Sequence, residues 1–373
     1  MIKITSDFDH GNIVVQDATD LSDIRLGIKP DGAAKFHQWF YYKVETRSGE
    51  ALVMNIVNAG SASYVEGWKD YRAVASYDGE QWFRVNTNYT DDVLTIRHAP
   101  ERDVVYYAYF AAYPTTRHRS FIERIKSENA FSHSRLGETL DGQTIDYFQA
   151  GEGTLQYWVI ARQHPGEDMG SWWMEGFLHA LADEADEAAT ALKKAATVHI
   201  VPCMNLDGVA RGHLRTNAAG VDLNRAWRNT TMDKSPEVFL VRNAMKKTGV
   251  DFFLDVHGDE AIPNNFLDPG WGTPSWTDES DSRFERYRSL MLEISKDFQT
   301  KDGYPKTAPG KANLDIATNY VTEEWRCLAM TLEMPFKDAN VNPDPEQGWS
   351  PERCRAFARE HLQAMARIAP QLR

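Results

Sequence analysis

Cysteine is scarce in this sequence, and its distribution excludes a disulfide framework. The only three cysteines among 373 residues, Cys203, Cys327 and Cys354, are an odd number at wide spacings. Disulfide-stapled domains and cysteine-based zinc sites need closely spaced pairs, so both are excluded. No segment approaches the roughly 18 uninterrupted apolar residues of a membrane-spanning helix. The first residues, MIKITSDFDHGN, lack the basic end and apolar core of a signal peptide. We therefore expect a cytoplasmic protein with no membrane partner.

Basic residues are also under-represented relative to acidic ones. Lysine and arginine total 41 against 54 aspartates and glutamates, which gives a net charge of −13. This charge repels nucleic acid, and no run of basic residues overrides it locally, so nucleic acid is excluded as a partner. The length suffices for two domains, because single hydrophobic cores stop growing at roughly 250–300 residues. No pattern in the chain specifies an oligomeric state.

The pattern of apolar residues changes partway along the chain. Residues 1–113 read as short strands separated by turn signals, such as Asp78-Gly79, and this pattern predicts an N-terminal antiparallel β-sandwich domain. From residue 114 onward, continuous apolar strands alternate with amphipathic helices, including one long helix over residues 172–196. This alternation predicts an α/β domain over residues 114–373, with a mixed, largely buried central sheet and flanking helices.

Two histidines and a glutamate follow apolar strands in the second domain. His164 and Glu167 come after LQYWVIA, and His257 ends FFLDVH. A lone H-x-x-E pair matches by chance, and by itself it is more often an exposed loop histidine beside a solvated glutamate. Two histidines with a carboxylate, however, make a three-ligand zinc site of the catalytic kind, which leaves one coordination position open. We therefore interpret His164, Glu167 and His257 as zinc ligands.

A further carboxylate, Glu333, ends the apolar strand LAMTLEM. Burying an unpaired charge is costly, so a carboxylate at such a position needs a partner or a function. Beside a metal site, the functional reading is a general base that acts on water.

The loop NLDGVARGHLRTNAAGVDLNRAW, residues 205–227, contains Arg215 and the adjacent pair Asn224 and Arg225. A guanidinium group donates two parallel hydrogen bonds, so this pair suits the planar capture of a carboxylate. The alternative reading is a surface loop whose arginines pair with the acidic excess of the chain.

Taken in order, these motifs resemble those of the zinc carboxypeptidase family M14. His164-x-x-Glu167, Arg215, VDLNRAW, His257 and TLEMPF follow the family's order, over nearly the whole chain. WFYYKV in the first domain, with NLDGV and GVDLNR in the second, is similar to the cytosolic carboxypeptidase branch, which includes tubulin deglutamylases and bacterial relatives. The resemblance implies a bacterial metallocarboxypeptidase with one Zn²⁺ per chain that acts on the C-termini of peptides or proteins.

The resemblance also implies a role for each site residue. His164, Glu167 and His257 would bind zinc, and Glu333 would deprotonate the attacking water and pass a proton to the leaving amine. Arg215 would stabilise the oxyanion, and Asn224 and Arg225 would hold the terminal carboxylate of the substrate. Asp222 would orient a zinc-binding histidine, which fixes the tautomer and basicity of that ligand.

Two features of the family are not assigned by the sequence. A mobile tyrosine usually lies about twenty residues before the base, where this chain reads PGKANLD; Tyr304 and Tyr320 lie on either side. Lys311, Thr318 and Arg326 suggest a preference for an acidic C-terminal residue, as in a deglutamylase, although solvated surface charges are the other reading.

Two other functions fit part of the pattern. A zinc deacylase of N-acyl amino acids, related to aspartoacylase, shares H-x-x-E and an Asn-Arg clamp. A non-catalytic module that binds a C-terminus would keep the clamp without the chemistry, but the survival of all three ligands and the base favours an enzyme. We expect Trp172, Trp173, Met174 and Phe177 to pack their helix against the sheet and the β domain rather than to bind a ligand.

Overall fold

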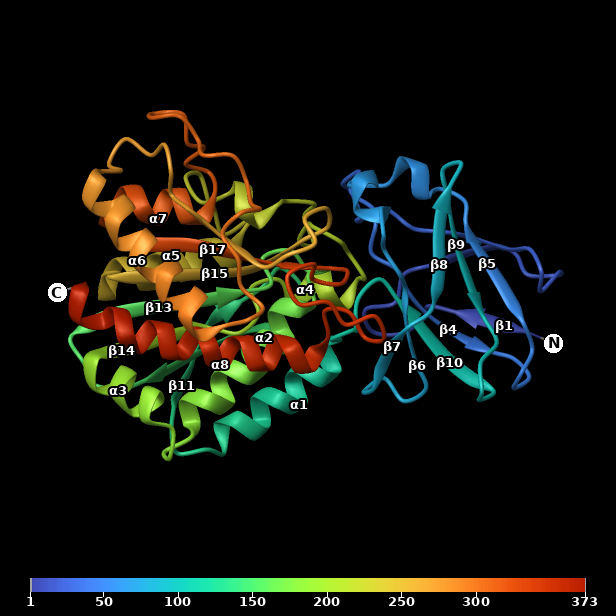
Figure 1. Cartoon of the computed structure of the whole chain (residues 1–373), viewed down its shortest axis with the longest axis horizontal. Helices are drawn as coiled ribbons and strands as arrows, with labels where there is room; N and C mark the ends of the chain where they lie inside the picture. The colour runs from blue at the N-terminus through green and yellow to red at the C-terminus, as the bar shows by residue number, and fades with distance from the viewer. Residues whose placement is uncertain (1, 373) are drawn as a thin grey trace.

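Two five-stranded sheets form the first part of the chain. The computed structural model describes residues 2–372 and places these sheets in the β domain at the right of Figure 1. One sheet has the order β1 (Lys3–Thr5), β4 (Tyr41–Glu45), β10 (Val104–Ala108), β6 (Val74–Ser76) and β7 (Trp82–Arg84). The other has the order β2 (Val14–Asp17), β3 (Ile24–Gly27), β5 (Leu52–Ile56), β9 (Val93–His98) and β8 (Asn86–Thr90).

Alternation of side chains explains why the two sheets pack together. Alternate residues of β5, Leu52, Met54 and Ile56, are buried, and the Tyr42 hydroxyl of β4 lies 3.3 Å from the sulfur of Met54 in the other sheet. The neighbouring strands are antiparallel except for β3 and β5, which are parallel. Gly79 has a φ of +76° between β6 and β7, as the predicted Asp-Gly turn requires. The predicted N-terminal β-sandwich is confirmed.

A seven-stranded mixed sheet forms the centre of the second domain, also as predicted. Its order is β11 (Ser132–Glu138), β12 (Thr144–Ala150), β14 (Ala196–Val201), β13 (Leu155–Ala161), β15 (Phe252–Asp259), β17 (Leu328–Pro335) and β16 (Phe266–Pro269). The inner strands β14, β13, β15 and β17 are parallel, and every residue of β15 and β17 is buried. Such strands need cover on both faces, which explains their continuous apolar runs.

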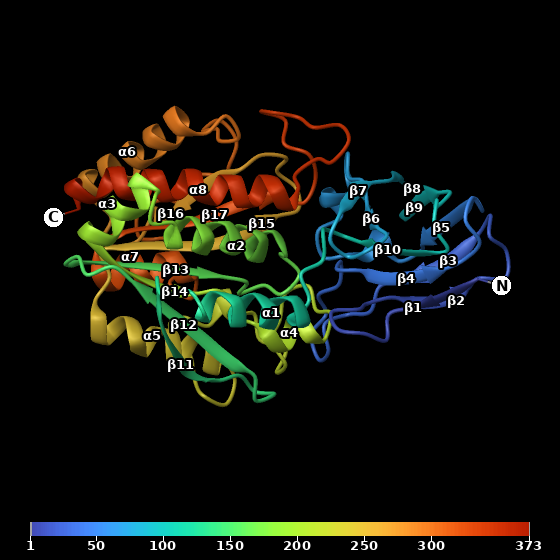
Figure 2. The ribbon, with the colours of Figure 1, turned by 90° about the horizontal axis from the view of Figure 1, so that it is seen from below.

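Helices supply this cover. The α-helices are α1 (Thr115–Lys126), α2 (Met169–Ala182), α3 (Glu187–Ala195), α4 (Leu206–Ala210), α5 (Pro236–Thr248), α6 (Asp278–Ile294), α7 (Ala317–Trp325) and α8 (Pro351–Ile368). Short 3₁₀ helices span Ala59–Ser61, Val65–Trp68, Leu223–Arg225 and Ala369–Gln371. Figure 2 shows α2, α3, α6 and α8 on one face of the sheet and α5 and α7 on the other.

The prediction of one helix over residues 172–196 is wrong, because two separate helices occupy this segment. The first ends at Ala182, and the second begins at Glu187 after Asp186. The Asp186 side chain accepts hydrogen bonds from the backbone N–H groups of Ala188 and Ala189 and so caps a new helix. The chain therefore turns, and α3 returns along β14.

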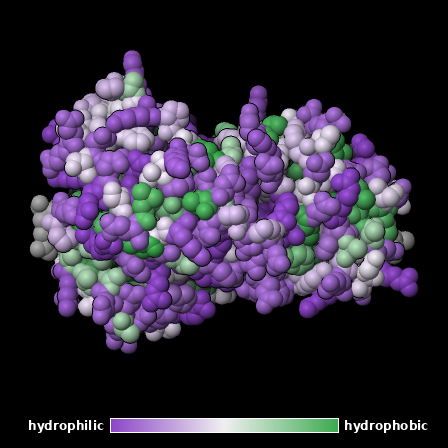
Figure 3. Space-filling view, in the orientation of Figure 1, coloured by the Kyte–Doolittle hydropathy of each residue, from purple (hydrophilic) through white to green (hydrophobic). Residues whose placement is uncertain are grey.

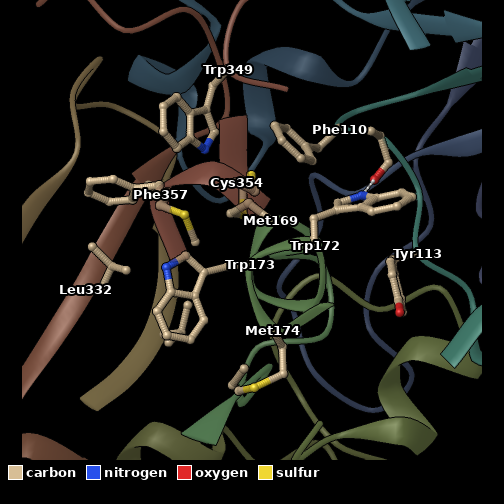
Figure 4. Packing of buried hydrophobic residues seen from close by; sticks show 14 of the residues in the cluster. Phe110, Tyr113, Met169, Trp172, Trp173, Met174, Leu332, Trp349, Cys354 and Phe357 are labelled. Carbon is tan, nitrogen blue, oxygen red and sulfur yellow. Dashed lines mark hydrogen bonds between the residues drawn. The ribbon is translucent and has the colours of Figure 1, made fainter. Parts of the chain in front are cut away.

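The aromatic residues of α2 pack in the core, as the sequence predicts. Figure 4 shows Trp172 directed toward the β domain, where its indole N–H donates to the carbonyl of Ala111 at 2.8 Å. Trp173 stacks on Phe177 with ring centroids 5.0 Å apart. Trp172, Trp173, Met174 and Phe177 are all buried, so this cluster is structural.

A buried carboxylate joins the two domains. Asp168, just before α2, accepts hydrogen bonds from the imidazole of His10 at 3.0 Å and from the backbone N–H of Tyr113 at 2.6 Å. Arg162 forms an ion pair with the same carboxylate at 2.6 Å. All three side chains are at most 1% exposed, and a buried charge is tolerated only when it is paired in this way. The contacts of His10 and Tyr113 with Asp168 therefore join the β domain to the α/β domain.

The surface of the molecule is mainly polar. In the face shown in Figure 3, hydrophilic side chains dominate and hydrophobic residues occur in small, separate patches. Among residues 2–372, no helix has both the length and the apolar character that crossing a membrane requires.

Candidate metal centre and active site

The predicted functional residues converge because their strands are parallel neighbours. β13, β15 and β17 lie side by side, so their carboxyl ends meet at one edge of the sheet. His164 and Glu167 lie in the loop after β13, His257 lies near the end of β15, and Glu333 lies near the end of β17. His257 and Glu333 are direct register partners. Segments that are up to 169 residues apart in the chain therefore share one site.

Alternation along the strands decides which side chains face the site. On β15, Leu254 and Val256 belong to the core beneath α2 and α8, so Asp255 and His257 point to the opposite face. On β17, Leu332 belongs to the same core, and Glu333 points away from it. The site thus lies on the face that α5 and α7 cover, beyond the ends of these helices.

Three possible metal ligands meet at this edge. The ligand atoms of His164, Glu167 and His257 all lie within 4.8 Å of one another. The Nδ1 of His164 is 2.6 Å from Oε1 of Glu167, and the Nδ1 of His257 is 2.8 Å from Oε2. The two Nδ1 atoms are 3.1 Å apart. All three residues are buried.

The far side of each imidazole is held by a carboxylate. The Nε2–H of His164 donates to Asp222 at 3.0 Å, and the Nε2–H of His257 donates to Asp255 at 2.9 Å. With Nε2 protonated, the Nδ1 of a neutral imidazole carries the free lone pair. Two lone pairs and the Glu167 carboxylate then face one another with no proton between them, an arrangement that a cation stabilises. The residues therefore fit Zn²⁺.

Electrostatics show that the ligand set attracts positive charge. Without a metal, protonated His164 and His257 supply this charge, outweigh the effect of burial and hold the pKa of Glu167 well below the ordinary range. Burial likewise opposes the charge on Asp222, yet His164 and Arg215 lower its pKa. Both carboxylates are therefore ionised and attract positive charge to the site.

Asp255 is a site residue that the sequence analysis missed. Its position two residues before His257 on a strand places both side chains on one face, and this spacing is the signal that identifies it. The Gln163 amide also donates to its carboxylate, at 2.6 Å. A polar partner thus holds Asp255 while Asp255 orients His257.

We expect the substitution Asp255→Asn to weaken zinc binding by about 10- to 100-fold, because the imidazole of His257 loses its anionic acceptor. Competition with a chromogenic chelator measures this affinity. The matched control is Asp146→Asn. It alters a similar contact, in which His133 lies 2.7 Å from Asp146, but this contact is outside the active site, so the zinc affinity should be unchanged. Equal affinities of the wild type and Asp255→Asn would contradict the assigned role.

Glu333 lies beside the ligands with one oxygen unengaged. Its side chain is buried, and Oε2 has no hydrogen-bond partner among residues 2–372. Tyr304 contacts Oε1 through its hydroxyl at 3.3 Å and donates to Asp259 at 2.8 Å. Burial raises the pKa of Glu333 well above its usual range, against the effect of His257 and together with Glu167 and Asp259. A carboxyl group with a raised pKa is a stronger proton acceptor once ionised.

Arg215 is positioned by both domains. Its Nε–H donates to Asp222 at 2.7 Å, and its guanidinium lies over the rings of Phe36 and Tyr64, with centroids 5.5 and 5.7 Å away. The Asp31 carboxylate accepts the backbone N–H groups of residues 214, 215 and 216 at 2.6, 2.7 and 2.9 Å. Asp31, Phe36 and Tyr64 all come from the β domain, which therefore sets the conformation of this catalytic-domain loop.

Asn224 and Arg225 occupy a single 3₁₀ turn that Asp222 initiates. The Asp222 carboxylate accepts the backbone N–H of Asn224 at 3.0 Å. The Asn224 side-chain carbonyl accepts the backbone N–H of Ala317 at 2.8 Å, which ties the turn to the start of α7. The Arg225 guanidinium donates to the backbone carbonyl of Asn224 at 2.8 Å.

One cavity of about 420 Å³ brings these groups together. Its lining residues are Tyr64, Glu66, His164, Glu167, Arg215, Asn224, Arg225, Gly258, Asp259, Glu260, Ala261, Asp268, Tyr304, Ile316, Thr331 and Glu333. Every catalytic and substrate-binding candidate from the sequence lies in this lining, together with His164 and Glu167, while His257 lies just behind it. Besides the ligand Glu167, three glutamates and two aspartates line the cavity and make it strongly acidic.

The residues that the sequence left open fall in different places. Tyr304 lines the cavity, whereas Tyr320 packs against Trp227 with ring centroids 6.1 Å apart. Lys311 and Arg326 are exposed and lie outside the cavity lining. Thr318 is buried behind the lining, with its hydroxyl 2.7 Å from that of Thr331.

Comparison with known proteins agrees with this geometry. The family model of the cytosolic carboxypeptidase N-terminal domain matches residues 4–110, and that of the zinc carboxypeptidases matches residues 119–351. A protein of Zymomonas mobilis is 46% identical over 371 residues, which cover 100% of this chain and 97% of that protein. Cytosolic carboxypeptidase 6 of Caenorhabditis elegans is 25% identical, over 88% of this chain and 77% of the relative.

A solved structure extends the comparison to three dimensions. The metallo-carboxypeptidase from Pseudomonas aeruginosa, in complex with (2-guanidinoethylmercapto)succinic acid, is 43% identical, has a TM-score of 0.97 and covers 100% of both chains. The match includes both domains in the same arrangement, so the likeness is not limited to the catalytic half. The chain therefore belongs to the zinc carboxypeptidase family M14 and is a metallocarboxypeptidase that carries a cytosolic carboxypeptidase N-terminal domain.

Proposed function

We propose that this protein removes the C-terminal residue from peptides or proteins, with one Zn²⁺ per chain held by His164, Glu167 and His257. The observation that supports it most strongly is the convergence of three buried ligand atoms within 4.8 Å, with each imidazole oriented by a carboxylate. Zn²⁺, when bound, supplies the Lewis acidity that activates water and polarises a carbonyl group.

The protein groups complete the chemistry around this ion. Glu333 accepts a proton from the attacking water and delivers it to the nitrogen of the leaving amine. Arg215 donates to the carbonyl oxygen as negative charge develops on it, and a fixed cation costs little reorganisation at that moment. The Tyr304 hydroxyl contacts Glu333 at 3.3 Å and lines the same cavity.

Recognition of the free C-terminus falls to Asn224 and Arg225. Both line the cavity on the side of α7, and a guanidinium beside an amide binds a carboxylate through parallel hydrogen bonds. The relative from Pseudomonas aeruginosa binds a succinic acid derivative, which also carries carboxyl groups. The clamp therefore fixes the substrate so that its last peptide bond lies next to Glu333.

An acidic C-terminal residue is not part of this proposal. Lys311 and Arg326, which suggested such a preference, are exposed and lie outside the cavity lining. Among the described residues, Arg215 and Arg225 are the two cationic side chains of the lining, and both have roles in binding the main chain of the substrate.

We also propose that residues 1–113 and 114–373 are the two domains and that the protein acts in the cytoplasm. The last β-domain strand ends at Ala108 and α1 begins at Thr115, which supports a boundary between them. The names of the relatives, cytosolic carboxypeptidases, support the location.

A substrate comparison tests the proposed reaction. Benzoyl-glycyl dipeptides with a free C-terminus are expected to be cleaved, and the same dipeptides with a C-terminal amide are not, because the amide cannot engage the Arg225 guanidinium as a carboxylate does. N-acetyl and N-succinyl amino acids are the discriminating substrates. Hydrolysis of these alone would show a deacylase and overturn the proposal.

A further inference from the structure

Glu260 is a buried carboxylate that the reaction described so far does not use. It directly follows β15, lines the cavity and is 7% exposed. No other residue among 2–372 donates a hydrogen bond to its side chain or forms an ion pair with it. The neighbouring Asp259, by contrast, accepts the backbone N–H groups of Ala261 and Ile262 at 2.8 and 2.5 Å and the Tyr304 hydroxyl at 2.8 Å. The Glu260 carboxylate is therefore available to a ligand in the cavity.

Glu260 lies on the side of the cavity that the β domain forms. Gly67, in the 3₁₀ helix Val65–Trp68, approaches it so closely that a Cβ atom on Gly67 would lie 2.9 Å from the Cβ of Glu260. Tyr64 and Glu66, from the same segment, also line the cavity. The carboxylate clamp lies on a different side, where it is hydrogen-bonded to the start of α7. Glu260 and the clamp therefore contact different parts of a bound peptide.

The residue of the substrate that comes next to this wall is the penultimate one. The carbonyl group of the scissile bond belongs to that residue, and in the proposed reaction Arg215 donates to this carbonyl. Arg215 itself lies over the ring of Tyr64, with the centroid 5.7 Å away. Glu66 is exposed and also lines an adjoining cavity of about 720 Å³ on the β domain, so the preceding part of a peptide has room to continue along it.

The cations that act on Glu260 already have partners. Arg215 is paired with Asp222 at 2.7 Å, and the buried Lys337 donates to the backbone carbonyl of Lys69 at 2.7 Å. A buried carboxylate without a counter-charge is costly. A ligand that places a positive charge beside Glu260 therefore gains an ion pair that the free enzyme lacks.

We propose that Glu260, together with Glu66 at the rim of the cavity, selects substrates whose penultimate residue has a basic side chain, lysine or arginine. The ring of Tyr64 offers apolar surface to the methylene stem, while the charged end pairs with the Glu260 carboxylate. A glutamate in the same position meets a like charge. This inference rests on the proposed carboxypeptidase function and concerns the residue before the scissile bond rather than the residue that is released.

The test uses benzoyl dipeptides that all end in phenylalanine and carry lysine, norleucine or glutamate before it. Norleucine has an unbranched aliphatic side chain and lacks the charge of lysine. For the wild type, we expect kcat/KM for lysine to exceed that for norleucine by about 10- to 100-fold, and that for glutamate to be the lowest. A second series that ends in arginine repeats the comparison, so that the result does not depend on the C-terminal residue.

Substitution of the two glutamates locates the effect. Glu260→Gln is expected to lower kcat/KM for the lysine substrate by about 10- to 100-fold and to change that for norleucine by less than about threefold. Glu66→Gln should lower the lysine value by only about two- to threefold, because an exposed ion pair contributes little. A purely structural role of Glu260 would lower both values together.

The matched control is Asp268→Asn, which removes a carboxylate from the same cavity, on β16. It should keep the lysine-to-norleucine ratio of the wild type, which separates pairing with Glu260 from a general effect of the acidic cavity. Equal values for lysine and norleucine in the wild type, or an unchanged ratio in Glu260→Gln, would overturn the role of Glu260 and leave the carboxypeptidase function intact. Cleavage of no dipeptide of either series by the zinc-loaded wild type would instead contradict the proposed function itself.

Discussion

Replacing Glu333 with glutamine is expected to lower kcat by roughly 10³- to 10⁴-fold, because the amide cannot accept the proton of the attacking water. The fold should be unaffected. Glutamine has the same shape, and burial already disfavours the charge of Glu333, as the raised pKa of this carboxyl group shows. Steady-state kinetics with a benzoyl-glycyl dipeptide measure the effect, and metal analysis and thermal unfolding verify that zinc content and stability are retained.

A second buried glutamate provides the matched control for this substitution. Glu237 lies in the first turn of α5, outside the cavity, and burial raises its pKa to about 7. Glu237→Gln therefore also removes a buried carboxylate, but it should leave kcat unchanged. A Glu333→Gln variant that keeps more than a tenth of the wild-type kcat would show that Glu333 is not the base.

Removal of the metal is expected to abolish turnover and to destabilise the protein. Without a cation, the Glu167 carboxylate and the lone pairs of two imidazoles face one another at 2.6 to 3.1 Å, and only proton uptake relieves the repulsion. A ligand that binds only the folded state stabilises it by about 4 kcal/mol when its concentration is 1,000 times Kd. We therefore expect a lower unfolding temperature after chelation with 1,10-phenanthroline.

Readdition separates this effect from general damage by the chelator. Stoichiometric Zn²⁺ should restore both turnover and the unfolding temperature, whereas Mg²⁺ should restore neither, because it prefers an octahedral shell of oxygen ligands. A non-chelating isomer of phenanthroline should have no effect. Full activity in a preparation shown to contain no transition metal would contradict a zinc-dependent mechanism.

The sequence identified the site residues that stand at the ends of apolar strands. His257 and Glu333 were predictable because parallel strands must end at one edge, so polar residues at their carboxyl ends meet. Asp255 was missed although it obeys the same two-residue alternation. The two-residue spacing places Asp255 on the same face as His257, but the contact between its carboxylate and the Nε2 of His257 is seen only in the structure.

Other features depend on how distant segments dock, and no local pattern encodes them. Asp31 precedes the Arg215 loop by more than 180 residues, and its three backbone hydrogen bonds exist only after the domains meet. The sequence suggested Lys311, Thr318 and Arg326 as determinants of specificity, but it did not reveal that β16 lies next to β17 and brings Asp268 into the cavity. The break between α2 and α3 was overlooked because the capping role of Asp186 competes with good helix formers on both sides.

Because Asp31 of the β domain holds the backbone of residues 214–216, the α/β domain depends on the β domain for the conformation of its active site. A bound partner or a mutation that displaces the β domain would move Arg215 without contacting the zinc ligands. Such a molecule would keep its zinc but lose turnover. The junction between the domains therefore controls activity in a way that an assay of zinc content does not detect.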